Sequence, residues 1–369
     1  MPDHVTFLLA GLQGGGAERS IVTLANAFAE RQMKVDLVLA RASGPFLSNV
    51  SPSVDVIELK AKRNAFSLPG FIGYLRRASP KAVISAIDDM NFIALLGARL
   101  ANSDTRTIVT IRSTLSQSFK GSKNWRGRYV APLLTSRFYR RADAVVAVSG
   151  GVADDLAENF DLPRENIEVI YNPVVTPELI EDSKAPLDHP WFAEGEPPVI
   201  LGVGRLITAK NFPSLIRAFA AIRKRSPARL MILGEGPERS SLEALVQELG
   251  IDDDVALPGF AKNPFSYMRQ AGLFVLSSRW EGLPGVLIQA LACGCPVVST
   301  DCPSGPREIL EGGRFGLLVP PEDDQALSDA ILKALASPVD REMLLKRANC
   351  FDVDSAATSY LSLVNAHVQ

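Results

Sequence analysis

The sequence contains little cysteine and little histidine, with four cysteines and three histidines among 369 residues. So few cysteines in so long a chain do not form the disulfide framework that supports small secreted proteins. No apolar run approaches the roughly 18 residues that a membrane-spanning helix requires. The first residues lead into a short apolar strand without the basic segment that begins a signal peptide. We therefore expect a cytoplasmic globular protein.

An excess of charge of one sign is also lacking, since 39 Lys and Arg stand against 41 Asp and Glu. This balance disfavours a general polyanion-binding protein, although it does not describe local patches. Two nucleotide-binding patterns are absent as well, the dinucleotide pattern Gly-x-Gly-x-x-Gly and the P-loop. Their absence disfavours a simple dehydrogenase and a P-loop ATPase.

The chain does contain a regular alternation of short β-branched runs and amphipathic segments. Strands that read as continuous apolar runs are buried on both faces, and their alternation with helices predicts parallel sheets covered by helices. The fold class is therefore α/β, with doubly wound sheets. The expected strands are residues 5–10, 34–40, 82–85, 106–111, 144–148, 198–203, 229–233, 273–276 and 296–299. The expected helices include residues 17–30, 212–224, 238–249 and 284–292.

The alternation is interrupted by a proline-rich polar stretch at residues 172–198, which is typical of a linker. We expect an N-terminal domain at 1–178, a linker at 179–197 and a C-terminal domain at 198–352. A last helix at 353–369 is expected to pack back on the first domain. Two doubly wound domains that face each other would leave a ligand-binding cleft between the carboxyl ends of their strands.

A first glycine-rich turn, GLQGGGAER at residues 11–19, closes a strand and opens a helix. Glycines let a loop approach an anionic group, toward which the helix would direct its N-terminal N–H groups. Gly14, Gly15 and Gly16 are thus candidate ligand-binding residues. A plain strand-to-helix connection explains the same glycines equally well.

A second turn, GVGRLITAKNF at residues 202–212, carries Arg205 and Lys210 between a strand and a helix. Arginine offers a planar fork of donors and lysine a compact charge, and together they suit a diphosphate. Two solvated surface cations are the alternative. Their position at a strand end favours the binding role.

A third turn, SSRWEGLPGVLIQA at residues 277–290, places Glu281 in a loop before a helix. Pro284 is a favourable first helical residue, so that Gln289 falls inside the helix. The helix N–H groups that we expect to be free beside Glu281 belong to Gly285, Val286 and Leu287. A positive helix end beside a carboxylate suits a substrate with phosphates and sugar hydroxyls. A capping role for Glu281 and a surface position for Gln289 are the alternatives.

The segments GGGAERS, VGRLITAKNF, LGEGPER and SSRWEGLPGVLIQALACGCPVVSTDCPSGPREIL together resemble retaining glycosyltransferases of family 4, which have the two-domain GT-B fold. The resemblance implies that Arg205 and Lys210 hold the diphosphate of a nucleotide-sugar donor. The family's Glu-x7-Glu motif falls on Glu281, which would contact the donor sugar, and on position 289, which would contact the ribose. The other expected donor-binding residues are Gly15, Gly16, Gly204, Gly285, Val286 and Leu287, with Phe260 and Lys262 near the base.

The sequence departs from this family at two points. Position 289 is Gln, whose carbonyl accepts hydroxyl protons more weakly than a carboxylate does. Many family members carry an acceptor-side histidine in the first domain, whereas His4, His189 and His367 do not lie at strand ends there. We therefore assign no catalytic histidine. The residues expected on the acceptor side are Gly14, Glu18, Arg112 and Asp88 or its neighbour Asp89.

Retaining transfer can proceed by front-face attack, in which the leaving diphosphate itself accepts the acceptor's proton. The protein then stabilises the phosphate charge through Arg205, Lys210 and the helix N–H groups, and orients the sugar through Glu281. This scheme requires no metal and no cofactor. The spacing of the clustered cysteines fits no zinc pattern. Buried structural thiols are expected at Cys293, Cys295 and Cys302.

Residues 106–141 contain nine Lys and Arg, no Asp or Glu, and five interleaved aromatic residues. Such a face suits an anionic membrane, where each cation contributes about 1 kcal/mol. The alternatives are a solvated helix face and nucleic-acid binding, which nothing else in the chain supports. We expect peripheral contact with the inner face of the cytoplasmic membrane and no nucleic-acid partner.

These observations predict a retaining, metal-independent hexosyl-type glycosyltransferase that uses a UDP-sugar donor. The expected acceptor is a glycan or polyprenyl-linked sugar in cell-surface polysaccharide or lipopolysaccharide biosynthesis, because GGGAER with STDCPSGPREIL resembles bacterial enzymes of that kind. Two alternatives stay open. A nucleotide-sugar epimerase of GT-B fold would need no acceptor, and a non-catalytic sugar-nucleotide-binding protein is favoured only by Gln289.

Overall fold

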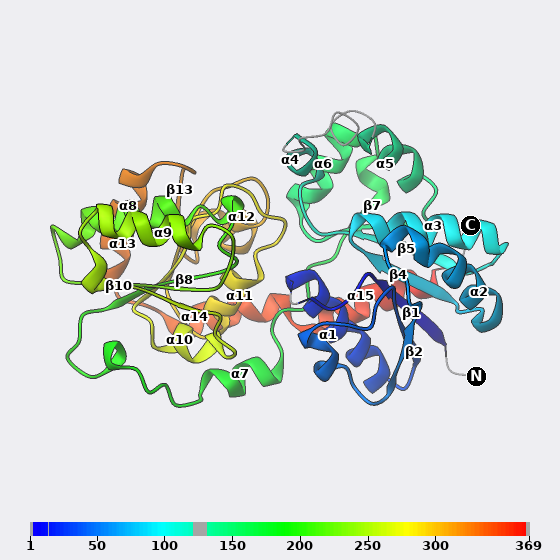
Figure 1. The fold of residues 1–369 in the computed structure, drawn as a ribbon, viewed down its shortest axis with the longest axis horizontal. Coiled ribbons are helices and arrows are strands. Elements are labelled where there is room, and N and C mark those ends of the chain that lie inside the picture. Colours follow the sequence, from blue (N-terminus) through cyan, green and yellow to red (C-terminus); the bar gives the residue numbers. More distant parts are fainter. Residues whose placement is uncertain (1–2, 14, 121–130, 367–369) are drawn as a thin grey trace. The chain divides into compact units, whose positions relative to one another are not determined.

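The computed structural model describes residues 3–13, 15–120 and 131–366. The chain divides into two compact units, Met1–Pro173 with Val353–Gln369 and Val174–Asp352. Each unit contains one sheet of parallel strands with helices around it (Figure 1). The prediction of an α/β protein with two doubly wound, Rossmann-like sheets is confirmed.

The first unit contains a seven-stranded sheet in the order β3-β2-β1-β4-β5-β6-β7. Its strands are β1 (His4–Leu9), β2 (Lys34–Leu39), β3 (Val54–Glu58), β4 (Ala82–Ala86), β5 (Arg106–Ile111), β6 (Ala144–Ala147) and β7 (Ile167–Val169). Its helices are α1 (Gly16–Glu30), α2 (Leu68–Ala78), α3 (Asp88–Ala101), α4 (Leu115–Lys120), α5 (Ala131–Tyr139), α6 (Gly150–Phe160) and α15 (Val353–Asn365).

The central strand β1 contributes to two separate cores, because successive side chains of a strand point to opposite faces. Phe7 packs in one core with Phe28 of α1 and Tyr360 of α15. Leu8 belongs to the other core, which includes Phe71 of α2. Both faces of the sheet are therefore covered, which explains why the inner strands read as continuous apolar runs.

The second unit contains a six-stranded sheet in the order β10-β9-β8-β11-β12-β13. Its strands are β8 (Val199–Val203), β9 (Arg229–Leu233), β10 (Val255–Gly259), β11 (Leu273–Leu276), β12 (Val297–Thr300) and β13 (Leu317–Val319). Its helices are α7 (Pro177–Ser183), α8 (Phe212–Arg223), α9 (Arg239–Glu248), α10 (Pro264–Gln270), α11 (Gly285–Ala292), α12 (Pro306–Ile309), α13 (Asp324–Leu335) and α14 (Arg341–Ala348). One core joins Leu273 and Val275 of β11 to Phe219 of α8 and Ile331 of α13.

The segment 179–197, which we expected to link the domains, belongs to the second compact unit. It includes most of α7, and the main-chain oxygen of Asp182 accepts a 2.7 Å hydrogen bond from Nδ2 of Asn263. The chain changes units between Pro173 and Val174 and again between Asp352 and Val353. Our expected boundary at residue 178 is therefore corrected, because prolines occur here inside a packed segment.

The loops that follow β8 and β9 pack in close contact at the carboxyl edge of the second sheet. Gly234 has φ +147°, and a Cβ atom there would lie 1.9 Å from the carbonyl oxygen of Gly204. Only glycine permits both this backbone conformation and this approach. The loop after β11 joins the same group, because the N–H of Arg279 donates to the carbonyl of Ala209 at 2.8 Å.

Candidate active site

Lys210 and Glu281 form an ion pair at the carboxyl edge of the second sheet. Lys210 follows β8 and Glu281 follows the neighbouring β11, so parallel strand order brings them to the same edge. Nζ of Lys210 lies 2.6 Å from Oε1 of Glu281, and their side chains are 19% and 13% exposed. Both side chains of this charge pair are thus partly exposed, so that a ligand can reach them.

The Glu281 carboxylate is held through one oxygen. Ser278 Oγ also donates to Oε1, at 2.6 Å. The main-chain N–H of Glu281 donates to the carbonyl of Pro303 at 3.2 Å, which fixes the loop itself. Oε2 has no hydrogen-bond partner among the residues that the structure describes. The second carboxylate oxygen is thus available to accept a hydrogen bond from a ligand hydroxyl.

Arg205 lies at the end of β8 and is exposed. Within the described part of the chain its guanidinium has no ion-pair or hydrogen-bond partner. Gly204 packs beneath Lys210, since a Cβ on Gly204 would lie 3.4 Å from Cε of that lysine. The N–H of Gly204 donates to Leu233, so Gly204 supports the lysine rather than offering its N–H to a ligand.

The N-terminal turn of α11 presents two free N–H groups rather than three. The N–H of Leu287 donates to Pro284 at 3.0 Å, whereas those of Gly285 and Val286 have no acceptor among the described residues. Pro284 is the N-cap of α11, not its first helical residue as we expected. Our expectation of a free Leu287 N–H is therefore corrected. Gln289 is 9% exposed, and its amide makes no hydrogen bond with a described residue.

Two further expected donor residues follow the edge strand β10. Phe260 is 77% exposed, and Lys262 is exposed without an ion pair in the described ranges. The adjacent Gly259 lies against the Glu235–Arg239 ion pair, whose oxygen and nitrogen are 2.7 Å apart. An aromatic face and polar groups therefore occur together at this strand end.

The remaining expected residues lie in the first unit. Gly15 is the N-cap of α1 and no side chain caps this helix, while Glu18 in its first turn folds back against Gly15. Gly16 has open space beside it. Gly14 lies outside the described residues, as does the side chain of Asp88, and Asp89 accepts a 3.1 Å hydrogen bond from Asn64.

Arg112 follows β5 and donates from Nη1 to Oδ1 of Asn172 at 2.5 Å. Its Nε is buried without a partner among the described residues. Burial lowers the pKa of Arg112, and the neighbouring Tyr360 and Glu18 oppose that shift. The hydrogen bond to Asn172 thus fixes the Arg112 guanidinium at the carboxyl end of β5.

In the second unit, Cys293, Cys295 and Cys302 are buried thiols. Burial raises the pKa of Cys293 to about 12 and also raises the pKa of Cys295. Burial and the nearby Glu281 raise the pKa of Cys302 to about 12. In the described ranges no three His, Cys, Asp or Glu side chains gather as a metal site would require.

Comparison with known proteins identifies the family. The model for Glycosyltransferase Family 4 matches residues 14–177, and the model for Glycosyl transferases group 1 matches residues 185–349. The N-acetylgalactosamine-N,N'-diacetylbacillosaminyl-diphospho-undecaprenol 4-alpha-N-acetylgalactosaminyltransferase of Campylobacter jejuni is 32% identical over 324 residues, which are 86% of each chain. The chain belongs to glycosyltransferase family 4. The predicted resemblance is confirmed.

This family 4 glycosyltransferase has further relatives over nearly its whole length. The lipopolysaccharide core biosynthesis glycosyltransferase LpsE of Rhizobium meliloti is 27% identical over 356 residues, 95% of this chain and 96% of that protein. The structure of Anabaena HepE in complex with UDP-glucose superposes with a TM-score of 0.79 at 20% identity, covering 97% of this chain and 99% of that one. The predicted GT-B fold is confirmed.

The glycosyltransferase also contains supporting residues to which our reading of the sequence gave no role. Ser277 and Ser278, at the end of β11, and Thr300, at the end of β12, are almost fully buried. Ser277 Oγ donates to the carbonyl of Lys210 at 2.9 Å, and Thr300 Oγ1 donates to that of Ser278 at 2.6 Å. The only sequence signal was a pair of polar residues directly after an apolar strand.

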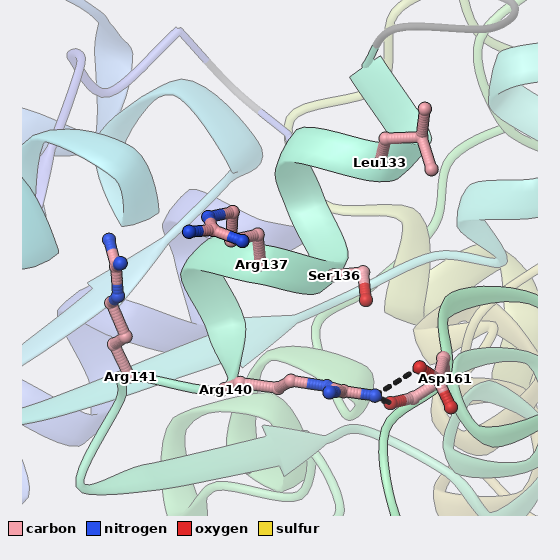
Figure 2. A pocket seen from close by; sticks show the side chains of 6 residues that line it. All are labelled: Leu133, Ser136, Arg137, Arg140, Arg141 and Asp161. Atoms are coloured by element: carbon pink, nitrogen blue, oxygen red, sulfur yellow. Dashed lines mark hydrogen bonds and ion pairs between the residues drawn. The ribbon is translucent and has the colours of Figure 1, made fainter.

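A basic hollow lies at the C-terminal end of α5 in the first unit. It has a volume of about 550 Å³ and is lined by Leu133, Ser136, Arg137, Arg140, Arg141 and Asp161 (Figure 2). Arg140 pairs with Asp161, whereas Arg137 and Arg141 are exposed and have no ion pair with a described residue. Leu133 is 74% exposed. Residues 121–130 of the basic stretch lie outside the described residues.

No helix in the described ranges combines the length and hydrophobicity needed to cross a bilayer.

Proposed function

We propose that this glycosyltransferase transfers a sugar from a UDP-sugar to a glycan or polyprenyl-linked acceptor, with retention of configuration, in cell-surface polysaccharide biosynthesis. The observation that carries the proposal is the Lys210–Glu281 pair at 2.6 Å, next to the free N–H groups of Gly285 and Val286. Cations and helix N–H groups suit a diphosphate, and a carboxylate with one free oxygen suits a sugar hydroxyl.

The donor would lie with its diphosphate between Arg205, Lys210 and the N-terminus of α11. Gln289 would accept a hydrogen bond from the ribose, and the base would lie by Phe260 and Lys262. The UDP-glucose complex of Anabaena HepE, which has the same fold, supports the choice of UDP. In the first unit, Arg112 and Glu18 would serve the acceptor, and Gly15 and Gly16 would bind the donor.

Transfer would proceed on one face of the donor sugar. The bond from the anomeric carbon to the phosphate oxygen breaks, and its electron pair stays on the diphosphate. The acceptor oxygen bonds to the anomeric carbon from the same face, and its proton passes to the leaving phosphate oxygen. Arg205, Lys210 and the α11 N–H groups stabilise the charge that develops on the diphosphate, while Glu281 orients the sugar.

The acceptor proposal rests on the relatives and on the basic hollow. The Campylobacter jejuni relative is named for a diphospho-undecaprenol acceptor, and the Rhizobium meliloti relative for lipopolysaccharide core biosynthesis. Arg137 and Arg141 with the exposed Leu133 would contact an anionic membrane at the cytoplasmic face, which is where a polyprenyl-linked acceptor is held.

Transfer assays with purified protein, UDP-sugars and bacterial membrane extract, in EDTA, test the proposal. We expect a labelled product with the donor's anomeric configuration, measured by NMR, and release of UDP.

Glu281→Ala should lower transfer at least about a hundredfold, roughly 2.7 kcal/mol, while UDP affinity stays within about twofold. The control Glu342→Ala changes an exposed carboxylate of α14 and should be fully active. Unchanged transfer in Glu281→Ala would contradict the role of Glu281, and an altered UDP-sugar formed without acceptor would indicate an epimerase.

A further inference from the structure

We infer that the consecutive serines Ser277 and Ser278 are positioning residues that hold the two charged groups of the site separately, Ser277 for Lys210 and Ser278 for Glu281. The inference rests on the proposed function of this site. Successive residues of an extended chain direct their side chains to opposite sides. Their hydroxyl groups therefore reach different partners, although the residues adjoin.

Ser278 is fixed by one hydrogen bond of its side chain and one of its main chain. Its side chain is fully buried, and its Oγ donates to Oε1 of Glu281 at 2.6 Å. Its own carbonyl accepts from Oγ1 of Thr300 on the neighbouring strand at 2.6 Å. Water cannot replace the partner of a buried hydroxyl, so breaking its hydrogen bond leaves an unsatisfied polar group. Thr300 thus fixes the serine, and the serine fixes the carboxylate.

This arrangement becomes important once the donor is bound. In the structure, Lys210 and Ser278 share the same carboxylate oxygen. A diphosphate offers Lys210 a stronger and more highly charged partner than a single carboxylate, and a lysine side chain is flexible enough to turn toward it. The bond from Ser278 does not depend on the ligand. It keeps Glu281 oriented, with Oε2 toward the sugar, when the lysine changes partner.

Ser277 acts on the lysine through the main chain. It is 2% exposed, and its Oγ donates to the carbonyl of Lys210 at 2.9 Å. The bond fixes the point at which the lysine side chain begins, while Gly204 packs against its carbon stem. Ser277 therefore controls diphosphate binding, and Ser278 controls the orientation of the catalytic carboxylate.

Paired serine substitutions test this division. The probes are UDP for binding and, for turnover with membrane extract, whichever of UDP-glucose, UDP-galactose and their N-acetylated forms the wild-type chain uses fastest. Ser278→Ala should lower kcat at least about tenfold, with donor KM and UDP affinity within about threefold of wild type. Ser277→Ala should weaken UDP binding about three- to tenfold and lower kcat less. Thr300→Val should reproduce the Ser278→Ala pattern to a smaller degree.

Ser328→Ala is the matched control, because Ser328 is a fully buried serine of α13 whose hydroxyl has no partner among the described residues. It should change neither kcat nor UDP affinity, and thermal unfolding should show all variants folded. If Ser278→Ala leaves kcat unchanged, or changes kcat and UDP affinity together as Ser277→Ala does, the inference is overturned. Failure of the wild-type chain to bind UDP or turn over any of the donors would instead overturn the proposed function, and the inference with it.

Discussion

At the scale of single residues, the site of the second unit depends on how one carboxylate is partnered. Glu281 is held through Oε1 by Lys210 and Ser278, so its other oxygen faces no described donor. Arg205 is exposed and unpaired within the described residues, unlike Lys210. The two cations therefore differ in the free state. In the proposed donor complex, Lys210 would exchange its existing partner for the diphosphate, whereas Arg205 would gain a partner.

Arg205→Ala should raise the UDP dissociation constant at least about tenfold, or about 1.4 kcal/mol. Since Arg205 has no described partner to lose, the change reports ligand binding rather than folding. Isothermal titration measures it, with Arg269→Ala, an exposed arginine of α10, as the control that should bind UDP normally. Equal UDP affinity in Arg205→Ala and wild type would remove Arg205 from the site.

Gln289→Glu should tighten UDP binding about three- to tenfold, because a carboxylate accepts hydroxyl protons more strongly than an amide carbonyl does. The side chain of Gln289 makes no hydrogen bond within the described ranges, so the substitution breaks none. Inorganic pyrophosphate, which has no ribose, should bind both forms equally. A UDP affinity that does not rise, or an equal gain for pyrophosphate, would contradict contact between position 289 and the ribose.

Sequence reasoning found the charged residues of the site but not the residues that hold them. Glu281 and Lys210 belong to recognisable motifs, whereas Ser278 and Thr300 become partners only when β11 and β12 pair in register, with Leu276 beside Ser299. Nothing in the local sequence shows that Ser278 and Thr300 lie within hydrogen-bond distance of each other. The N–H of Leu287 was wrongly expected to be free, because it donates to the carbonyl of Pro284 three residues earlier, a 3₁₀-type bond that tightens the first turn.

At the scale of elements, the strands missed by sequence reasoning are the four sheet edges, β3, β7, β10 and β13. Edge strands are covered less completely than central ones, and β3 exposes three of its five residues while β7 has only three residues. They therefore lack the continuous apolar run by which the central strands were identified. The loops at the carboxyl ends of the central strands carry the charged residues of the site.

Gly234→Ala should destabilise the second unit by at least about 3 kcal/mol, because it adds a clash with Gly204 to an unfavourable backbone conformation. Thermal or urea unfolding measures the change. Gly312→Ala separates the two effects, since Gly312 has φ +67° but no atom near its Cβ position. It should cost only about 1–2 kcal/mol. Similar losses for both variants would show that the close approach of the two loops contributes little.

At the scale of the whole molecule, charge is balanced overall but unevenly distributed. The chain has a formal net charge of -2, yet residues 106–141 contain no acid. The first unit thus carries the basic hollow and the proposed acceptor-side residues, and the second unit carries most of the proposed donor site. This separation matches an enzyme in which one unit meets a membrane-bound acceptor and the other a soluble nucleotide sugar.

The variant with both Arg137→Ala and Arg141→Ala should bind anionic vesicles more weakly by about 2 kcal/mol, or roughly thirtyfold. Sedimentation with phosphatidylglycerol-containing vesicles measures this, and phosphatidylcholine vesicles should retain little protein. The matched control replaces Arg77 and Arg99, two exposed arginines of α2 and α3, and should bind like wild type. Equal loss in both double variants would point to net charge rather than to the hollow.

Calorimetric titration of the full chain with UDP, GDP and ADP in EDTA tests the central claim most directly. The donor site described here predicts that UDP binds with micromolar affinity without metal, and that GDP and ADP bind at least about tenfold more weakly. Absence of binding by all three nucleotides, in EDTA and again with Mn²⁺, would contradict a nucleotide-sugar donor site at Arg205, Lys210 and Glu281.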